Sequence, residues 1–362
     1  MQQDKELEKR IKERVSVSKD NIVNLDVVLD DAHSISHVGI KERELIIYGC
    51  KTIVGCIGGV ATKSDYRQKG LATRLMNRSI QQINHDQGDI MLVSGDRDLY
   101  RRQRCFPAAP MYRIRVTRSD AEGFDGSNIR LVPYNQEYLL HAISIHQKEP
   151  VRFHRDMQEF RVMLERRTPA PFWTRTEVFM LFNGDDVLGH IVVQEPRDDR
   201  RGKGRVRAVA EYAGVRSAIA DSIKLLFDRY KMEELLFFAP EHESEFLHIL
   251  HQMGIYGEKR NLGGHTFRII NLPRLMDRFT PYIEERIGRD SARSLSFARE
   301  SGKFTITYKQ ECLELDDESL VALIFGTSHG IEGEVISRSG EMGELLQALF
   351  PLPFLWPGLN SY

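Results

Sequence analysis

The stretch that decides the fold runs from Gly55 to Ala72 and reads GCIGGVATKSDYRQKGLA. A strand-like run ends at Val60-Ala61-Thr62, a short polar turn follows, and a helix is expected to begin near Gly70. Backbone N–H groups in such a turn and in the first helical turn have no partner within the helix and point outward. The stretch therefore predicts a binding site for phosphate oxygens.

The side chains of this turn are suited to a phosphate-binding site. Arg67 and Lys69 add positive charge close together. Gly70 lets the backbone approach a phosphate closely, and the small Ala72 leaves the N-terminus of the helix accessible. The paired glycines Gly58-Gly59 are unfavourable within a strand unless a bulge or a close-lying ligand uses them. The alternative is an ordinary strand–helix turn with a surface arginine and lysine.

The surrounding chain predicts a mixed α/β sheet with a crossover helix in the first third. The expected elements are a charged helix over 6–15, strands over 24–29, 34–40, 44–48 and 52–62, a helix over about 69–85 and a strand over 90–93. A polar, glycine-bearing linker, AEGFDGS, follows at 121–127. Residues 1–120 are therefore expected to form one domain.

Two further domains are predicted, over 128–271 and 272–362. The second repeats the plan, with a hairpin that turns at Asn183-Gly184-Asp185, a strand over 207–213, a helix over about 217–230 and a strand over 234–238. The third combines a helix over 275–287 with three short strands and two more helices. It ends in LFPLPFLWPGLNSY, whose apolar character predicts a tail packed against the body.

Composition excludes several classes of protein. The 362 residues include 51 Lys and Arg against 52 Asp and Glu, so no bulk attraction to nucleic acid or acidic membranes is expected. No apolar run approaches the roughly 18 residues of a membrane span, and the charged N-terminal segment lacks a signal peptide's apolar centre. Four cysteines without CxxC spacing predict a cytoplasmic protein without a metal site.

Other motifs carry less information. GxSxG, HExxH and GxxxxGK[ST] are absent from the sequence, which argues against common hydrolases, zinc proteases and P-loop proteins. His33 and His37 lie four residues apart in a strand-like run, so both are expected on one face of the strand. Without a third ligand they are interpreted as ordinary sheet residues rather than a metal site.

Arg67-Gln68-Lys69-Gly70-Leu71-Ala72 matches R/Q-x-x-G-x-G/A, and on this motif the chain resembles the GNAT superfamily of N-acetyltransferases. The resemblance implies a GNAT acyltransferase fold and acetyl-CoA as co-substrate. It also implies that the thioester carbonyl accepts a hydrogen bond from a backbone N–H near Val60. The residues expected to hold the cofactor are Val60, Ala61, Thr62, Arg67, Gln68, Lys69, Gly70, Ala72 and Thr73.

The segment GDRDLYRRQRCFPA, over 95–108, resembles the family's short helix with a tyrosine followed by a glycine–aromatic turn. Tyr100 matches the tyrosine that protonates the departing CoA thiolate, so the resemblance implies a catalytic role. Arg104-Cys105-Phe106 departs from the family's pattern at the turn. The alternative for Tyr100 is a half-buried tyrosine on an amphipathic helix.

The whole layout resembles the enhanced intracellular survival (Eis) family of bacterial acetyltransferases. That resemblance implies a catalytic GNAT domain over 1–120 with a shortened N-terminal part, a degenerate GNAT-like domain over 128–271, and a sterol-carrier-protein-like domain over 272–362. It places the main-chain carboxylate of Tyr362 at the active site, with simple packing of the tail as the alternative. It also implies homo-oligomers, although the residues themselves leave the oligomeric state open.

The predicted function is acetyl-CoA-dependent N-acetylation of a primary amine by direct attack on the thioester. The acceptor is a small-molecule or peptide amine whose identity the sequence leaves open. The alternative is a non-catalytic sensor that binds acyl-CoA or lipid. The shortened N-terminal part and Arg104-Cys105 favour the sensor, whereas Tyr100 and the phosphate turn favour the enzyme.

Overall fold

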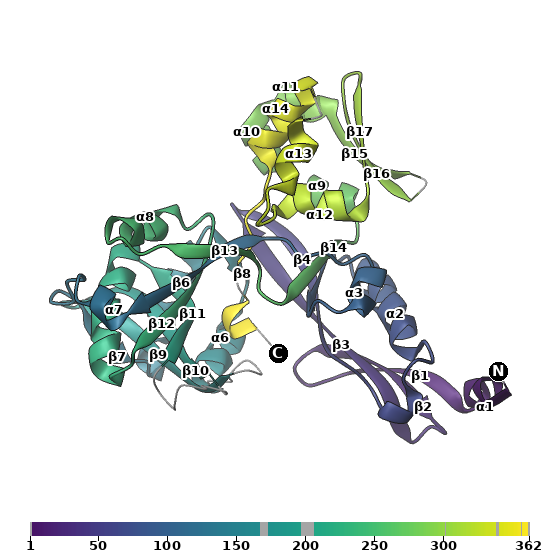
Figure 1. Cartoon of the computed structure of the whole chain (residues 1–362), viewed down its shortest axis with the longest axis horizontal. Helices are drawn as coiled ribbons and strands as arrows, with labels where there is room; N and C mark the ends of the chain where they lie inside the picture. Colours follow the sequence, from purple (N-terminus) through teal and green to yellow (C-terminus); the bar gives the residue numbers. More distant parts are fainter. Residues whose placement is uncertain are drawn as a thin grey trace. The chain divides into compact units, whose positions relative to one another are not determined.

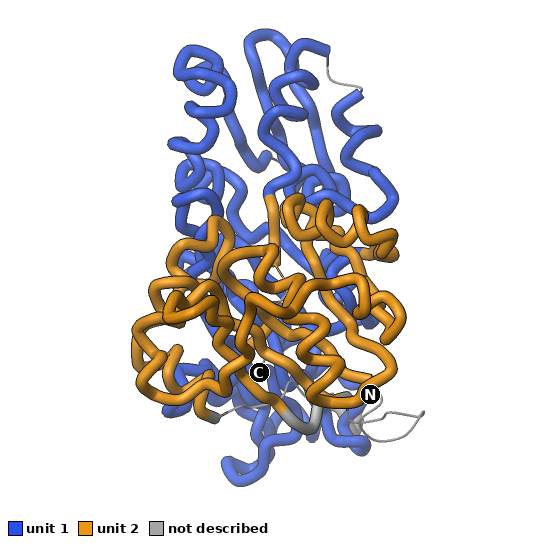
Figure 2. Tube along the Cα trace, turned by 90° about the vertical axis from the view of Figure 1, so that its left-hand side faces the viewer, with its two compact units in different colours: residues 1–108, 261–352 blue, residues 109–260, 353–362 orange. Residues whose placement is uncertain are grey.

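The computed structural model describes residues 2–166, 173–196, 206–300, 302–337, 340–355 and 357–360. The chain divides into two compact units (Figure 2). Unit 1 comprises residues 1–108 and 261–352, and unit 2 comprises residues 109–260 and 353–362. Each unit is therefore assembled from two separate lengths of chain.

The sheet of unit 1 has the strand order β1-β2-β3-β4-β5-β14 (Figure 1). Its strands are β1 (Ile11–Val17), β2 (Ile22–Leu29), β3 (His33–Ile47), β4 (Cys50–Thr62), β5 (Ile90–Ser94) and β14 (His265–Ile269). Among the pairings of these six strands, β4–β5 is parallel and the others are antiparallel, and α2 (Leu71–His85) makes the crossover between β4 and β5. The apolar side of α2 is buried in the core of this sheet. The mixed α/β sheet with a crossover helix is confirmed.

Two local predictions in this region were wrong. The helix α1 (Gln2–Arg10) ends before the expected limit, and the chain continues as the edge strand β1, in which Ile11 pairs with Leu29. Sheet pairing overrides the weak helical pattern there. The separate strands expected over 34–40 and 44–48 form one strand, β3, because β4 pairs along most of its length.

Unit 1 also contains the C-terminal elements up to residue 352. They are α9 (Leu272–Arg278), α10 (Thr280–Ile287), α11 (Arg289–Ser294), β15 (Leu295–Glu300), β16 (Lys303–Tyr308), β17 (Glu311–Leu315), α12 (Asp317–Phe325), α13 (Ile331–Ser337) and α14 (Gly340–Leu349). Buried Asp89 ties α9 to the sheet through Arg274 Nε at 2.7 Å and Arg278 Nε at 3.0 Å. The single helix expected over 275–287 is two helices that meet at Phe279.

The sheet of unit 2 has the order β13-β6-β12-β11-β10-β9-β7. Its strands are β6 (Pro110–Thr117), β7 (Arg130–Pro133), β9 (Trp173–Asn183), β10 (Asp186–Pro196), β11 (Val206–Gly214), β12 (Glu234–Pro240) and β13 (Gly257–Asn261). Its helices are α4 (Arg118–Ala121), α5 (Leu139–Lys148), α6 (Met157–Arg166), α7 (Arg216–Tyr230) and α8 (Ser244–Gln252), with short 3₁₀ turns η2 (Gln136–Tyr138) and η3 (Gly358–Asn360). Again one pairing, β11–β12, is parallel and a helix, α7, connects its strands.

Two strands join sheets that their position in the sequence does not suggest. β6 follows the first length of unit 1 but pairs with β12 in unit 2. β14 follows the first length of unit 2 but pairs with β5 in unit 1. The three-domain division at 120 and 271 therefore stays a prediction. In the structure, each sheet also contains a strand from a separate length of the chain.

Two further properties bear on the class of protein. Within the described residues, no helix combines the length and apolar character needed to cross a membrane. The cysteines Cys50, Cys56, Cys105 and Cys312 form no disulfide. Burial raises the pKa of the Cys56 thiol to about 11 and that of Cys105 to about 12, so both stay protonated at neutral pH.

Candidate active site

The strands β4 and β5 separate where the sequence analysis expects a cofactor arm. They pair from Val54–Ile90 to Ile57–Val93, after which β4 continues to Thr62 without a partner on β5. On the other side of β4, His37 pairs with Ala61 and Gly39 with Gly58. Two residues, Gly59 and Val60, thus lie opposite one, which is a β-bulge.

The predicted phosphate turn lies directly after this strand. Gly70 is the N-cap of α2, has φ of 75°, and no atom lies within 4 Å of the position that a Cβ would take. Gln68 also has a positive φ, of 61°. Arg67 and Lys69 are exposed, and Arg67 Nε donates to the Thr62 carbonyl oxygen at 3.2 Å. The turn therefore offers open backbone and two cations beside the unpaired first turn of a helix.

A surface hollow extends from the turn along α2. The residues that line it are Glu13, Gly70, Thr73, Arg74, Asn77, Arg78 and Gln81. Arg74 is already paired with Glu8, at 3.3 Å, and with Glu13. Thr73 borders the hollow, and Ala72 is half-buried in the first turn of α2.

Tyr100 lies on the short helix α3 (Asp98–Arg102) and is buried, with 1% of its surface exposed. Its ring packs against Gly95, where a Cβ would meet the ring at 2.7 Å. Its hydroxyl accepts a hydrogen bond from the Arg97 guanidinium, which also lies 3.5 Å from the Val60 carbonyl oxygen. Arg97 thus links Tyr100, the predicted general acid, to the bulge at Gly59 and Val60. Tyr100 is more deeply buried than the half-buried alternative expected, and its catalytic role stays a prediction.

Two side chains at the bulge, Arg97 and His37, were not predicted as site residues; His37 was interpreted as an ordinary sheet residue. His37 contacts Gly59 and is hydrogen-bonded to Asp26. The same-face argument for His33 and His37 fails because Ile35 is an extra residue in the pairing of β3 with β2, and a bulge offsets the alternation of side chains. No local pattern in the sequence marks this bulge.

Ser361 and Tyr362, including the predicted catalytic carboxylate, lie outside the described residues. The segment before them is held within unit 2. Leu359 N–H donates to Glu211 Oε2 at 3.1 Å, and Arg155 Nε donates to Asn360 Oδ1 at 3.1 Å. Nowhere in the described part of the chain do three or more His, Cys, Asp or Glu side chains converge as a metal site would require.

Unit 2 has a strand separation of its own. β11 and β12 pair only from Val206–Glu234 to Ala208–Leu236, and Ala210 forms a bulge against β10. The turn before α7 is filled by a carboxylate of the chain itself. Glu149 Oε1 accepts a hydrogen bond from Gly214 N–H at 2.7 Å, and Glu149 pairs with Arg216 at 2.6 Å.

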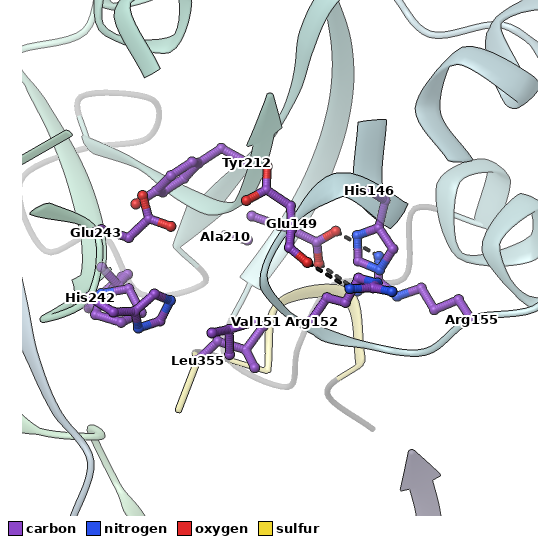
Figure 3. Close-up of a pocket in the computed structure, with 13 residues that line it drawn as sticks. His146, Glu149, Val151, Arg152, Arg155, Ala210, Tyr212, His242, Glu243 and Leu355 are labelled. Carbon is purple, nitrogen blue, oxygen red and sulfur yellow. Dashed lines mark hydrogen bonds and ion pairs between the residues drawn. The ribbon is translucent and has the colours of Figure 1, made fainter. Parts of the chain in front are cut away.

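A charged pocket lies at this second separation. Figure 3 shows Glu243 and His242 toward one side of it and His146 and Arg155 toward the other. Arg155 makes two hydrogen bonds of 2.7 Å with Glu211, and this pairing outweighs burial and holds the pKa of Glu211 well below its usual range. Burial, aided by nearby arginines, lowers the pKa of both histidines to about 4. They are therefore neutral at pH 7, and the charges lining the pocket largely satisfy one another.

Comparison with known proteins agrees with this geometry. Residues 1–103 match the family described as "Acetyltransferase (GNAT) domain". No curated protein matches the sequence significantly.

Several solved structures share the fold. A GCN5-related N-acetyltransferase from Anabaena variabilis is 14% identical, with a TM-score of 0.59 over 92% of this chain and 88% of that one. A GCN5-related N-acetyltransferase from Kribbella flavida is also 14% identical, with a TM-score of 0.62 over 92% and 87%. Eis1 from Mycobacterium abscessus is 12% identical, with a TM-score of 0.57 over 91% and 89%.

The first 103 residues of the chain therefore match a GNAT acetyltransferase domain. Beyond that domain, its likeness to Eis1 and to the two GCN5-related proteins extends over nearly the whole chain and is a likeness of fold. The resemblance to GNAT and Eis proteins drawn from the sequence is confirmed.

Proposed function

We propose that the protein is an acetyl-CoA-dependent N-acetyltransferase that transfers the acetyl group to a primary amine by direct attack on the thioester. The observation that carries the proposal is the bulge at Gly59 and Val60, where β4 leaves β5 directly before the open phosphate turn at Gly70. A groove between separating strands can hold an extended acyl-pantetheine arm, and the turn can hold its pyrophosphate.

The roles of the residues follow from these positions. The pyrophosphate binds the turn formed by Arg67, Gln68, Lys69 and Gly70 and the first residues of α2, Ala72 and Thr73. The arm lies along Val60, Ala61 and Thr62, and a backbone N–H near Val60 stabilises the tetrahedral oxyanion.

Tyr100 donates its hydroxyl proton to the CoA thiolate. Arg97, whose guanidinium already binds that hydroxyl, stabilises the negative charge left on the oxygen. The carboxylate of Tyr362 is a second catalytic candidate from the Eis resemblance. A free α-carboxyl has a pKa of about 3.5, so orienting the amine through water suits it better than proton abstraction.

We further propose that unit 2 is a duplicated GNAT-like domain that does not bind CoA. The carboxylate of Glu149 fills its strand–helix turn and would repel a pyrophosphate. For the elements from α9 to α14 we propose a scaffolding role in a sterol-carrier-like arrangement, which the Asp89 anchor to the catalytic sheet favours.

The test is CoA release when the purified protein is mixed with acetyl-CoA and a panel of primary amines. The wild type should release CoA only with an accepted amine. Tyr100→Phe should lose most of the turnover, about 10²- to 10⁴-fold, while its Kd for acetyl-CoA changes little because the phosphate turn is untouched.

Two results would contradict the proposal. Equal losses of turnover and acetyl-CoA affinity in Tyr100→Phe would refute the role of the tyrosine. Acetyl-CoA binding without transfer to any amine would favour the non-catalytic sensor, which is the alternative function.

A further inference from the structure

His37 occupies an unusual position for a sheet residue. A Cβ placed on Gly59 would lie 3.3 Å from both Nε2 and Cδ2 of the imidazole, and one placed on Gly39 would lie 3.7 Å from Nε2. The ring therefore lies against backbone that only glycine leaves uncovered. One third of the side chain, 33%, remains exposed, so a ligand at the bulge can reach it.

A buried carboxylate fixes the orientation of this ring. Asp26 on β2 is the direct cross-strand partner of His37, and its Oδ1 lies 3.1 Å from Nδ1 of the imidazole. The same oxygen accepts a hydrogen bond of 2.6 Å from Ser34 Oγ. Because an ionised carboxylate can only accept, Nδ1 carries the proton and donates it to Asp26. The lone pair of the neutral ring is therefore on Nε2, on the side of Gly59.

The bulge lies between this pair and the proposed acid. β3, with His37, flanks β4 on one side, and β5 flanks it on the other. On the β5 side, Arg97 reaches the Val60 carbonyl oxygen and binds the Tyr100 hydroxyl. A thioester held at Val60 would thus have a proton acceptor on one side and a proton donor on the other.

We propose that His37 is the general base of the acetyl transfer and that Asp26 is its positioning residue. This inference rests on the proposed function and adds a residue that the GNAT motifs do not include. At neutral pH a primary amine is mainly an ammonium ion and cannot attack, because its lone pair is bonded to a proton. An oriented neutral imidazole is the side chain best suited to take that proton near pH 7.

The proton and bond balance is complete. His37 Nε2 takes one proton from the ammonium, directly or through one water molecule, and the free amine attacks the thioester carbonyl. The C–N bond forms and the C–S bond breaks, while Tyr100 supplies the proton that converts the CoA thiolate to the thiol. The second amine proton leaves to solvent, His37 releases its proton to solvent, and Tyr100 is reprotonated from solvent. The overall products are the amide, CoA and one proton.

An ordinary sheet histidine would not need this setting. Asp26 is a buried carboxylate whose described polar partners are the His37 ring and the Ser34 hydroxyl, and burying such a group without function is unfavourable. Asp26 on β2 is hydrogen-bonded to the ring, and Arg14 on β1 is the cross-strand partner of Asp26. On the other side of the bulge, Arg97 contacts the Val60 carbonyl oxygen and the Tyr100 hydroxyl.

The test compares His37→Gln with His33→Gln. His33 lies on the same strand but is exposed, so its variant is the matched control. With the best amine of the panel, His37→Gln should lower kcat about 10²- to 10⁴-fold, with an unchanged Kd for acetyl-CoA and with the control at the wild-type rate. The deficit should shrink as the pH is raised, because a growing share of the amine is already neutral.

The pH profile separates a catalytic from a structural role. The wild-type kcat/KM should fall toward acidic pH, because a protonated imidazole cannot accept a proton, and His37→Gln should lack this acidic limb. Asp26→Asn should keep the limb but lower kcat, because the carboxylate that orients the ring is lost.

Each outcome decides a different point. Wild-type turnover in a folded His37→Gln variant would overturn the base assignment and leave the proposed function standing. An equal deficit at every pH would also overturn it, since that is the mark of a structural defect. A wild-type protein that binds acetyl-CoA but acetylates no amine would overturn the proposed function, and this inference with it.

Discussion

Replacing Gly70 by alanine separates the folding role of this residue from its proposed binding role. Gly70 has φ of 75°, and nothing lies within 4 Å of its missing Cβ. Alanine would therefore meet no neighbour, and the cost is the left-handed backbone alone, about 1–2 kcal/mol. Part of this cost is offset because alanine restricts the unfolded chain more than glycine does. The net loss of stability should be about 1 kcal/mol.

The expected loss of affinity is larger. If phosphate oxygens approach the backbone at Gly70, a methyl group there displaces one charge-assisted hydrogen bond, worth about 1.5–3 kcal/mol. That corresponds to a Kd for acetyl-CoA weakened about 10- to 150-fold. Gly184→Ala is the matched control. Gly184 has φ of 57°, no atom lies within 4 Å of its missing Cβ, and it lies in a hairpin turn of unit 2.

Calorimetric titration with acetyl-CoA and thermal unfolding measure the two effects. Both variants should lower the unfolding midpoint by similar small amounts, about 2–4 °C per kcal/mol for units of this size. Only Gly70→Ala should bind acetyl-CoA more weakly. Wild-type affinity in a Gly70→Ala variant as stable as the control would refute the phosphate turn.

Two further predictions concern stability. Burial, with a smaller contribution from Asp86, raises the pKa of Glu42 from 4.5 to about 7. Between these two pH values the folded protein holds a proton that the unfolded chain has released. The free energy of unfolding should therefore fall as the pH rises through this window. Glu42→Gln should flatten the thermal midpoint between pH 4.5 and 7, and an equal slope in both proteins would contradict the assignment. Asp89→Asn leaves Arg274 and Arg278 without their buried carboxylate and should cost about 3 kcal/mol, with faster hydrogen exchange in α9. Asp277→Asn, an exposed change on the same helix, should stay within about 0.5 kcal/mol.

Features that depend on neighbouring residues could be predicted from the sequence. The helix after Gly70 begins within two residues of the expected position, and the hairpin turn at Asn183-Gly184-Asp185 lies where its turn residues place it. The apolar periodicity of α2 and the alternation along β4 are local signals of this kind. The phosphate turn could be proposed for the same reason, since its residues are contiguous.

Features that depend on pairing between distant segments could not be predicted. Asp26 and His37 face each other only because β2 and β3 pair in one register, which the bulge at Ile35 sets. β1 forms although its sequence is charged and helix-like, because pairing with β2 decides its conformation. β14 joins the sheet of unit 1 although it begins 171 residues after the end of β5, and no local pattern predicts a pairing over that separation.

The two strand separations differ at the positions that the proposed cofactor site uses. Both units have a bulged strand that parts from a parallel neighbour before a helix. In unit 1 the bulge follows Gly58 and contains Gly59, so backbone is uncovered and the turn is open. In unit 2 the bulge is followed by Glu211, which is paired with Arg155, and Glu149 fills the turn.

Removing the Glu149 carboxylate would not restore a phosphate site there. Arg216 is held by Glu243 as well as by Glu149, and the turn contains no counterpart of Arg67 or Lys69. On the proposed function, a cationic turn, an uncovered bulge and the proposed proton-transfer groups on both sides of it act together in acyl transfer. In the described residues that combination is found in unit 1.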